Sequence, residues 1–121
     1  MKKIYACDDD MVVLMMVKRI LGSGYQVETS QSINGLLEKL DADRPDLILL
    51  DYLMPECDGL EAIAMLREKG YFPGIPIVVV TGDRDISLEV KCRDEGVEDF
   101  IQKPFVPDIL LARVKQVLAR K

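Results

Sequence analysis

The chain has 121 residues, a formal net charge of −5 and 31% charged side chains. This length fits one domain with one core, and the charged fraction argues against a disordered chain and against a membrane protein. The longest apolar run, residues 11–17, has seven residues, whereas a membrane helix needs about 20. Three aspartates follow soon after the N-terminus and interrupt any signal-peptide core, so we expect a cytoplasmic location without membrane contact.

The distribution of charge, the spacing of the cysteines and the absence of histidine exclude further classes of function. Lys and Arg are dispersed along the chain and form no basic stripe, so direct nucleic-acid binding is not expected. Cys7, Cys57 and Cys92 lack CxxC spacing and are expected to be reduced thiols. The chain has no histidine, which excludes Ser-His and Cys-His nucleophiles, imidazole metal ligands and a phosphohistidine carrier.

The first part of the chain predicts two strand–helix units. Residues 4–7 form a short apolar run that ends at three aspartates. Apolar positions 13, 17, 20 and 21 then recur at helical spacing until Gly22. Residues 25–29 alternate like a strand, and a second helical pattern follows a cap at Ser30 or Ser32 and ends before Pro45.

The second part repeats this order three times. Its strands are the apolar runs at residues 47–50, 77–80 and 99–102, and its helices are expected at about residues 58–69, 86–95 and from 107 onward. Continuous apolar strands that alternate with helices indicate a parallel sheet covered on both faces. Right-handed crossovers then give a doubly wound α/β fold that binds ligands beyond the carboxyl ends of its strands.

The residues just beyond the predicted strands suit phosphoryl chemistry. They are Asp8 and Asp9 after the first strand, Asp51 after the third, Thr81 after the fourth and Lys103 after the fifth. Carboxylates gathered at one edge repel each other unless a cation joins them, and Mg²⁺ (or Mn²⁺) prefers such oxygen ligands. The Lys103 ammonium and the Thr81 hydroxyl would stabilise charge on phosphoryl oxygens. Asp51 is the candidate nucleophile, because an aspartate can form an acyl phosphate.

Each of these residues alone has an ordinary structural interpretation. A single Asp after a strand is most often a helix cap or a turn residue, and we expect Asp10 to cap the first helix. A Thr at a strand end and a Lys before a Pro are also common. Their convergence at one edge of the sheet is what favours a phosphoryl site over a purely structural role.

The chain resembles the receiver domain of two-component response regulators over essentially its whole length, residues 1–121. The matching segments are residues 7–10 (CDDD), 51–59 (DYLMPECDG), 80–82 (VTG) and 100–105 (FIQKPF). The resemblance implies a flavodoxin-like fold, a single five-stranded parallel sheet in the order 2-1-3-4-5 with five helices. It also implies a phosphorelay switch rather than an enzyme, with catalysis limited to its own phosphorylation and slow autodephosphorylation.

The resemblance assigns roles around the nucleophile. It implies that Asp51 accepts a phosphoryl group from a sensor histidine kinase or a histidine phosphotransfer protein. Asp9, Asp51 and the backbone carbonyl of Leu53 would ligate Mg²⁺ directly. Asp8 would act mostly through water.

The resemblance also assigns a signalling side. Thr81 and Lys103 would bind phosphoryl oxygens, and the Lys103–Pro104 bond is expected to be cis. Phe100 stands where the family carries an aromatic residue linked to the Thr81 hydroxyl, although simple packing on an edge strand explains it equally well. An output domain or target protein would bind the face made by the fourth helix, the fifth strand and the fifth helix.

Two positions are expected to set the lifetime of the phosphorylated state. They are Leu53 and Asp83, each two residues after a site residue, and the family varies both. Leu53 cannot orient a hydrolytic water, so we expect a moderately long lifetime.

A docking surface is predicted beside the first helix. Met11, Val12 and Met15 are apolar on its expected outer side. Single exposed apolar residues are ordinary, but a cluster with flexible Met suits an adaptable protein contact. Because the family docks its kinases beside this helix, we favour a docking surface that also includes Pro104 and Phe105.

Two other classes of protein share part of this pattern. A haloacid-dehalogenase-like phosphatase also uses a strand-end aspartate, but it needs a second carboxylate two residues later, where this chain has Leu53. A flavodoxin-like electron carrier needs a hydroxyl-rich phosphate loop, where three aspartates would here repel a flavin phosphate. Both are disfavoured. The sequence leaves open whether the receiver stands alone or is part of a longer regulator.

Overall fold

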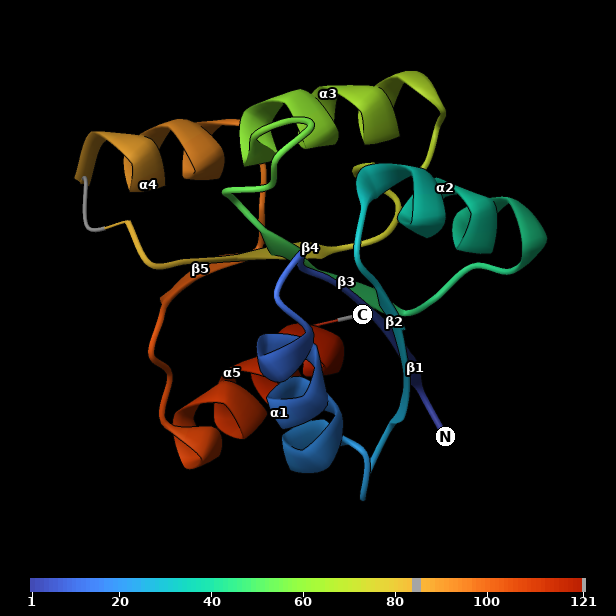
Figure 1. Cartoon of the computed structure of the whole chain (residues 1–121), viewed down its shortest axis with the longest axis vertical. Helices are drawn as coiled ribbons and strands as arrows, with labels where there is room; N and C mark the ends of the chain where they lie inside the picture. The colour runs from blue at the N-terminus through green and yellow to red at the C-terminus, as the bar shows by residue number, and fades with distance from the viewer. Residues whose placement is uncertain (84–85, 121) are drawn as a thin grey trace.

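The computed structural model describes residues 1–83 and 86–120. Its strands are β1 (Lys3–Cys7), β2 (Gln26–Ser30), β3 (Leu47–Asp51), β4 (Ile77–Thr81) and β5 (Asp99–Gln102). Its helices are α1 (Met11–Leu21), α2 (Ile33–Ala42), α3 (Gly59–Glu68), α4 (Ile86–Asp94) and α5 (Pro107–Ala119). The strands form one parallel sheet in the order β2-β1-β3-β4-β5 (Figure 1), which confirms the predicted fold class and strand order.

Helices cover both faces of the sheet. Figure 1 shows α1 and α5 on one face and α2, α3 and α4 on the other. Successive residues of β3 therefore enter different cores: Ile48 packs on the side of α2 and α3, whereas Leu49 packs on the side of α1 and α5. Every residue of β3 and β4 is buried, which explains why both strands are continuous apolar runs in the sequence.

The sheet register places the carboxyl ends of the strands side by side. Cys7 pairs with Leu50, Asp51 with Val80, and Thr81 with Gln102, the residue before Lys103. The chain runs outward from β1 to β2 and then returns to β3 on the other side of β1. Doubly wound folds bind ligands beyond the strand ends at such a reversal.

Polar caps set the starts of three helices. Asp10 caps α1 by accepting a hydrogen bond from the backbone N–H two residues later, as expected. Of the two candidates at α2, Ser32 is the residue that caps the helix. Asp58 and Glu61 form a reciprocal capping box at α3, a pattern whose three-residue spacing the sequence analysis did not use.

The buried stripe of α1 is displaced slightly from the predicted one. Leu14, Val17 and Leu21 are buried, while Val13 and Ile20 are only partly buried against the same core. The prediction omitted Leu14 because residues 11–17 are all apolar, so no polar side orients the helix. No helix in the described ranges is long and apolar enough to span a membrane.

Candidate functional site

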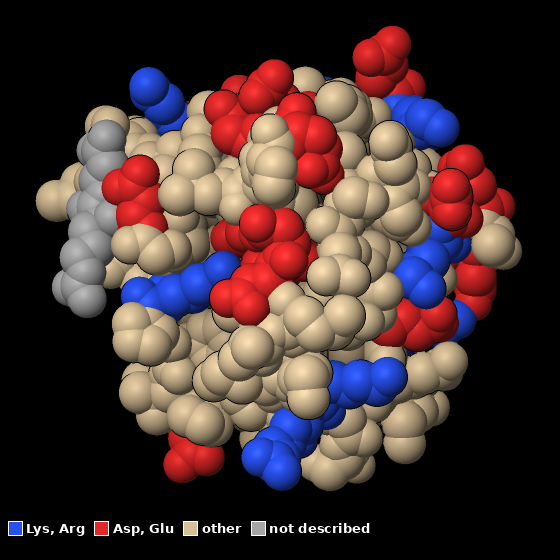
Figure 2. Space-filling model, in the orientation of Figure 1, with Lys and Arg blue, Asp and Glu red and all other residues tan. Residues whose placement is uncertain are grey.

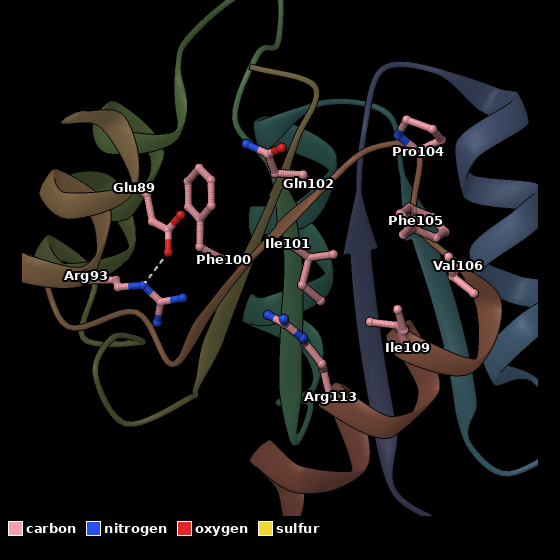
Figure 3. Close-up of a pocket in the computed structure, with 10 residues that line it drawn as sticks. All are labelled: Glu89, Arg93, Phe100, Ile101, Gln102, Pro104, Phe105, Val106, Ile109 and Arg113. Carbon is pink, nitrogen blue, oxygen red and sulfur yellow. Dashed lines mark hydrogen bonds and ion pairs between the residues drawn. The ribbon is translucent and has the colours of Figure 1, made fainter. Parts of the chain in front are cut away.

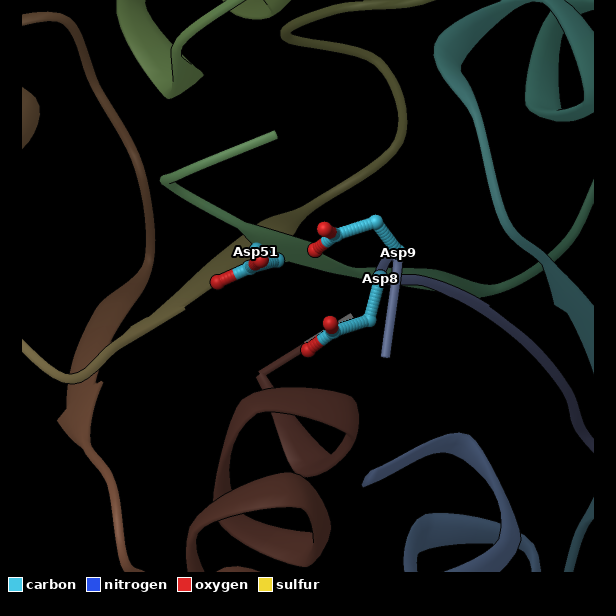
Figure 4. A group of neighbouring side chains, drawn as sticks. All are labelled: Asp8, Asp9 and Asp51. Carbon is cyan, nitrogen blue, oxygen red and sulfur yellow. The ribbon is translucent and has the colours of Figure 1, made fainter. Parts of the chain in front are cut away.

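Three carboxylates gather at the carboxyl edge of the sheet, as Figure 4 shows. One oxygen each from Asp8, Asp9 and Asp51 lies within 4.8 Å of the others. Asp8 and Asp51 are each 4% exposed, whereas Asp9 is exposed at the rim. Figure 2 shows acidic side chains near the centre of the face viewed in Figure 1. Oxygen donors arranged this way fit a hard divalent cation.

Crowding perturbs the carboxyl group at the centre of the cluster. Burial raises the pKa of Asp51 to about 6, and the negative charge of Asp8 adds to this rise, while Lys103 opposes it. The raised pKa means that the ionised carboxylate is disfavoured by its surroundings. A cation bound among these oxygens would relieve that cost, so the residues present fit a metal ion.

Lys103 joins the acidic cluster from β5. Its ammonium donates to Asp8 Oδ2 at 2.7 Å and to Asp51 Oδ1 at 3.1 Å, and its backbone N–H donates to the carbonyl of Thr81 at 2.7 Å. Burial lowers the pKa of Lys103, but these carboxylates outweigh it and leave the pKa above its ordinary value. The Lys103–Pro104 bond is cis, as expected.

The ion pair between Asp8 and Lys103 was not foreseen from the sequence. The sequence assigned Asp8 to a water-mediated metal contact and Lys103 to the phosphoryl group. The sequence did contain a signal for this ion pair. Three carboxylates and one ammonium are expected at the same edge of the sheet, so the ammonium of Lys103 is expected to pair with a carboxylate. Asp8 also accepts from the N–H of Asp10 at 2.9 Å, a bond that ties the Asp8 carboxylate to the N-cap residue of α1.

Thr81 lies at the end of β4 with its side chain fully buried. Its hydroxyl accepts a hydrogen bond from the N–H of Asp83 at 3.0 Å. The carbonyl of Asp83 accepts in turn from the side-chain amide of Gln102 at 3.2 Å. The predicted hydroxyl is therefore at the same edge as Asp51, but in this structure it holds the loop that follows β4.

The loop between β3 and α3 starts directly after Asp51. Leu53, two residues after Asp51, is 57% exposed and forms an isolated antiparallel bridge with Asp58. Met54 is buried in the core. Glu56 accepts a hydrogen bond from the N–H of Ile33 at 3.0 Å, a contact to which the sequence analysis gave no role.

Comparison with known proteins identifies the family to which the chain belongs. The family model described as "Response regulator receiver domain" matches residues 4–115. The chain belongs to this family. Receiver domains are the phosphoacceptor switches of two-component systems.

Individual relatives agree with this assignment. This receiver domain is 40% identical over 119 residues to Response regulator MprA of Mycobacterium leprae, covering 98% of this chain and 51% of that protein. The chain thus spans about half the length of this curated relative. Chemotaxis protein CheY4 of Vibrio cholerae superposes with a TM-score of 0.89 at 30% identity, covering 97% of this chain and 98% of that one. The BeF3-activated DrrB receiver domain gives 0.87 at 30% identity, covering 100% and 99%.

The receiver domain's predicted output face carries a groove between α4, β5 and α5, shown in Figure 3. Phe100 is buried and points toward α4, while Ile101 points toward α5. Asp99 accepts from Arg93 at 3.2 Å and from Arg113 at 3.1 Å, so it links α4 to α5 across β5. The burial of Phe100 fits the packing interpretation, and its link to the Thr81 hydroxyl stays a prediction.

The outer side of α1 is apolar and exposed, as the sequence predicted. Val12 and Met15 are each 64% exposed, and Met11 and Met16 are exposed beside them. Phe105 corrects the predicted docking surface: it is 8% exposed and packs in the core beneath α1 and α5. Its apolar ring faces the sheet from the segment that enters α5, whereas the neighbouring Pro104 stays exposed.

Proposed function

We propose that this receiver domain takes a phosphoryl group onto Asp51 from a sensor histidine kinase or a histidine phosphotransfer protein. A carboxylate oxygen of Asp51 attacks phosphorus, the bond from phosphorus to the donor's imidazole breaks, and the imidazole leaves with the bonding electrons. The observation that carries the proposal is the convergence of three carboxylates and the Lys103 ammonium at one edge of the sheet. We take residues 1–121 as one receiver unit.

We assign Asp9, Asp51 and the backbone carbonyl of Leu53 as ligands of Mg²⁺ (or Mn²⁺), with Asp8 acting through water. When bound, the cation supplies positive charge that offsets the carboxylates and the phosphoryl oxygens. The exposed carboxylate of Asp9 supports a direct role for this residue. Asp8 is already paired with Lys103, which supports a less direct one.

Lys103 and Thr81 would hold the phosphoryl oxygens. Lys103 is placed to keep one bond to Asp8 while it turns its other donors to the new group. Thr81 would donate its hydroxyl hydrogen to a phosphoryl oxygen, and the movement of the side chain toward the phosphoryl group would draw the hydroxyl away from the N–H of Asp83. Phe100 is already buried, so we expect the loss of the Thr81–Asp83 bond, rather than a further inward movement of the ring, to start the switch.

Two surfaces would serve protein partners. The exposed apolar residues Met11, Val12 and Met15 would contact the phosphoryl donor beside the site. The α4–β5–α5 face would contact an output domain or target protein. We place this activity in the cytoplasm, which the three buried free cysteines support, and limit catalysis to the domain's own phosphorylation and dephosphorylation.

Acetyl phosphate tests the assignment of the nucleophile. With Mg²⁺, the parent protein should gain one base-labile phosphoryl group, detected by intact-protein mass spectrometry. Asp51→Asn should gain none, because an amide does not form an acyl phosphate. Labelling of Asp51→Asn to the level of the parent would contradict the assignment.

The docking surface has a separate test. Replacing Met11 and Met15 with Gln should slow transfer from the partner's phosphohistidine and leave labelling by acetyl phosphate unchanged. Losses of equal size in both assays would indicate damage to the fold instead of the loss of a docking contact.

A further inference from the structure

The middle of the β3–α3 loop is tied to another helix by one side chain. Glu56 Oε1 accepts the N–H of Ile33, the first residue of α2, at 3.0 Å. An N–H in the first turn of a helix has no partner within the helix, and the positive end of the helix dipole favours a carboxylate there. The bond therefore joins the loop to α2 across 23 positions of sequence.

The same loop is fixed closer to Asp51 by packing. Met54 is buried, and its sulfur lies 3.6 Å from the thiol sulfur of Cys7 at the end of β1. Leu53 lies between Asp51 and this anchor and pairs with Asp58 across the loop. The direction of the Leu53 carbonyl consequently depends on the contacts of the loop residues that follow Leu53 in the chain.

We infer that Glu56 is a positioning residue of the metal site, which fixes the Leu53 carbonyl by holding the β3–α3 loop against the first turn of α2. This inference rests on the proposed function, because it takes that carbonyl as a metal ligand. Glu56 lies outside the cluster of Asp8, Asp9 and Asp51. Its effect therefore passes through the loop and not through a bond to the cation.

The first turn of α2 also supplies a matched control. The hydroxyl of Ser32 accepts the N–H of Gly35 at 3.1 Å, a bond of the same kind at the same helix end. Ser32→Ala removes this N-cap bond of α2, and it leaves the bond between Glu56 and the N–H of Ile33 in place. A comparison of Ser32→Ala with Glu56→Ala thus separates loop positioning from general weakening of α2.

Mg²⁺ titrations by calorimetry test the inference on the full chain. Glu56→Ala should bind Mg²⁺ about tenfold more weakly than the parent, the scale seen when outer contacts of metal ligands are removed. Glu56→Gln keeps an acceptor of the same length and should bind nearly as well as the parent, as should Ser32→Ala. In NMR spectra, Mg²⁺ should shift the Leu53 carbonyl carbon in the parent and in Glu56→Gln, but less in Glu56→Ala.

Each other outcome has a defined meaning. If Glu56→Ala binds Mg²⁺ as well as the parent, the inference fails while the proposed function stands. If Glu56→Gln is as weak as Glu56→Ala, the charge matters and the positioning role is wrong. Equal losses in Ser32→Ala and Glu56→Ala would also overturn it, since both would then act through α2 stability. If the parent itself does not bind Mg²⁺, the proposed function fails and the inference fails with it.

Discussion

The two loops that flank Asp51 are held in different ways. The β3–α3 loop, residues 52–58, is anchored along its length: Met54 packs in the core, Glu56 bonds to α2, and Asp58 closes the capping box of α3. On the other side, Thr81 and Gln102 hold the start of the β4–α4 connection through hydrogen bonds to the backbone of Asp83.

The helices that follow these loops, α3 and α4, also differ in how firmly they are held. In α3 the buried residues are Gly59, Ala62, Ile63 and Leu66, whereas α4 buries Leu88 and Cys92. Less buried apolar surface means a lower free-energy cost of displacement. The comparison indicates that the side of the site proposed to bind the metal is preorganised, while the side that faces α4 can change its contacts when a phosphoryl group arrives.

The largest effect is expected at Lys103, which connects the two sides. Lys103→Met leaves Asp8 and Asp51 without their ammonium partner and should lower the free energy of unfolding by about 2 to 3 kcal/mol in EDTA. Mg²⁺ should recover part of this loss, because it neutralises the same carboxylates. Urea denaturation measures both values, with the exposed Lys115→Met as control. A Lys103→Met protein as stable as this control would show that the ion pairs contribute little.

The next effect concerns the crowded carboxylate. The pKa of Asp51 is raised to about 6, so its protonated form stabilises the fold fully below the unfolded pKa of about 4, and this contribution is lost as pH rises through 6. Asp51→Asn lacks the charge and should be about 1 to 2 kcal/mol more stable than the parent at pH 7.5 without metal. The gain should shrink as pH falls below 6.

Thermal unfolding of Asp51→Asn across this pH range gives the measurement, and Asp94→Asn, at an exposed position, is the control. A gain that stays constant between pH 4 and pH 7.5 would mean that the titration of Asp51 is not the cause. A gain that persists in saturating Mg²⁺ would argue against a cation among these carboxylates.

A smaller effect is expected in the lifetime of the phosphorylated state. Leu53 is exposed two residues after Asp51, and its side chain cannot hydrogen-bond a water. Leu53→Asn should shorten the lifetime several-fold, because an amide can align the attacking water. Loss of phosphoryl label over time measures this directly. If Leu53→Asn loses its label no faster than the parent, Asp83 on the opposite loop or a group outside this pair sets the rate.

The smallest effect is expected at Gln102. Gln102→Ala removes one partly solvated hydrogen bond to the carbonyl of Asp83, worth about 0.5 to 1 kcal/mol. Amide resonances of residues 81–83 should therefore move a short way toward their beryllofluoride-bound positions, whereas Mg²⁺ affinity should not change. Gln116→Ala on the exposed side of α5 serves as control. A loss of Mg²⁺ affinity in Gln102→Ala would show that the two loops are not independent.

The fold followed from the sequence because its central strands are buried on both faces. The continuous apolar runs of β3 and β4 have to be buried on both faces, and the middle of a parallel sheet covered by helices provides this burial. The orientation of α1 was less certain, since an unbroken apolar segment fits more than one rotation and Leu14 was left out of its buried stripe.

The sequence predicted those residues of the candidate site whose position is determined by the end of a strand. Asp51 and Thr81 end neighbouring strands and Lys103 follows the next one, so parallel order alone brings them to one edge. The bond from Glu56 to Ile33 follows no periodicity or motif, because it depends on how a loop and a distant helix meet. Sequence spacing likewise could not rank Asp8 above Asp9 as the ion-pair partner of Lys103, since both follow the same strand.

The most direct test of this account is an NMR map of the beryllofluoride complex. Amide shifts on adding beryllofluoride to the Mg²⁺-bound protein should concentrate in residues 81–109 and be small in residues 52–58, with no response in Asp51→Asn. Shifts confined to the surroundings of Asp51, or larger in residues 52–58 than in residues 81–109, would contradict the division between a fixed metal side and a movable signalling side.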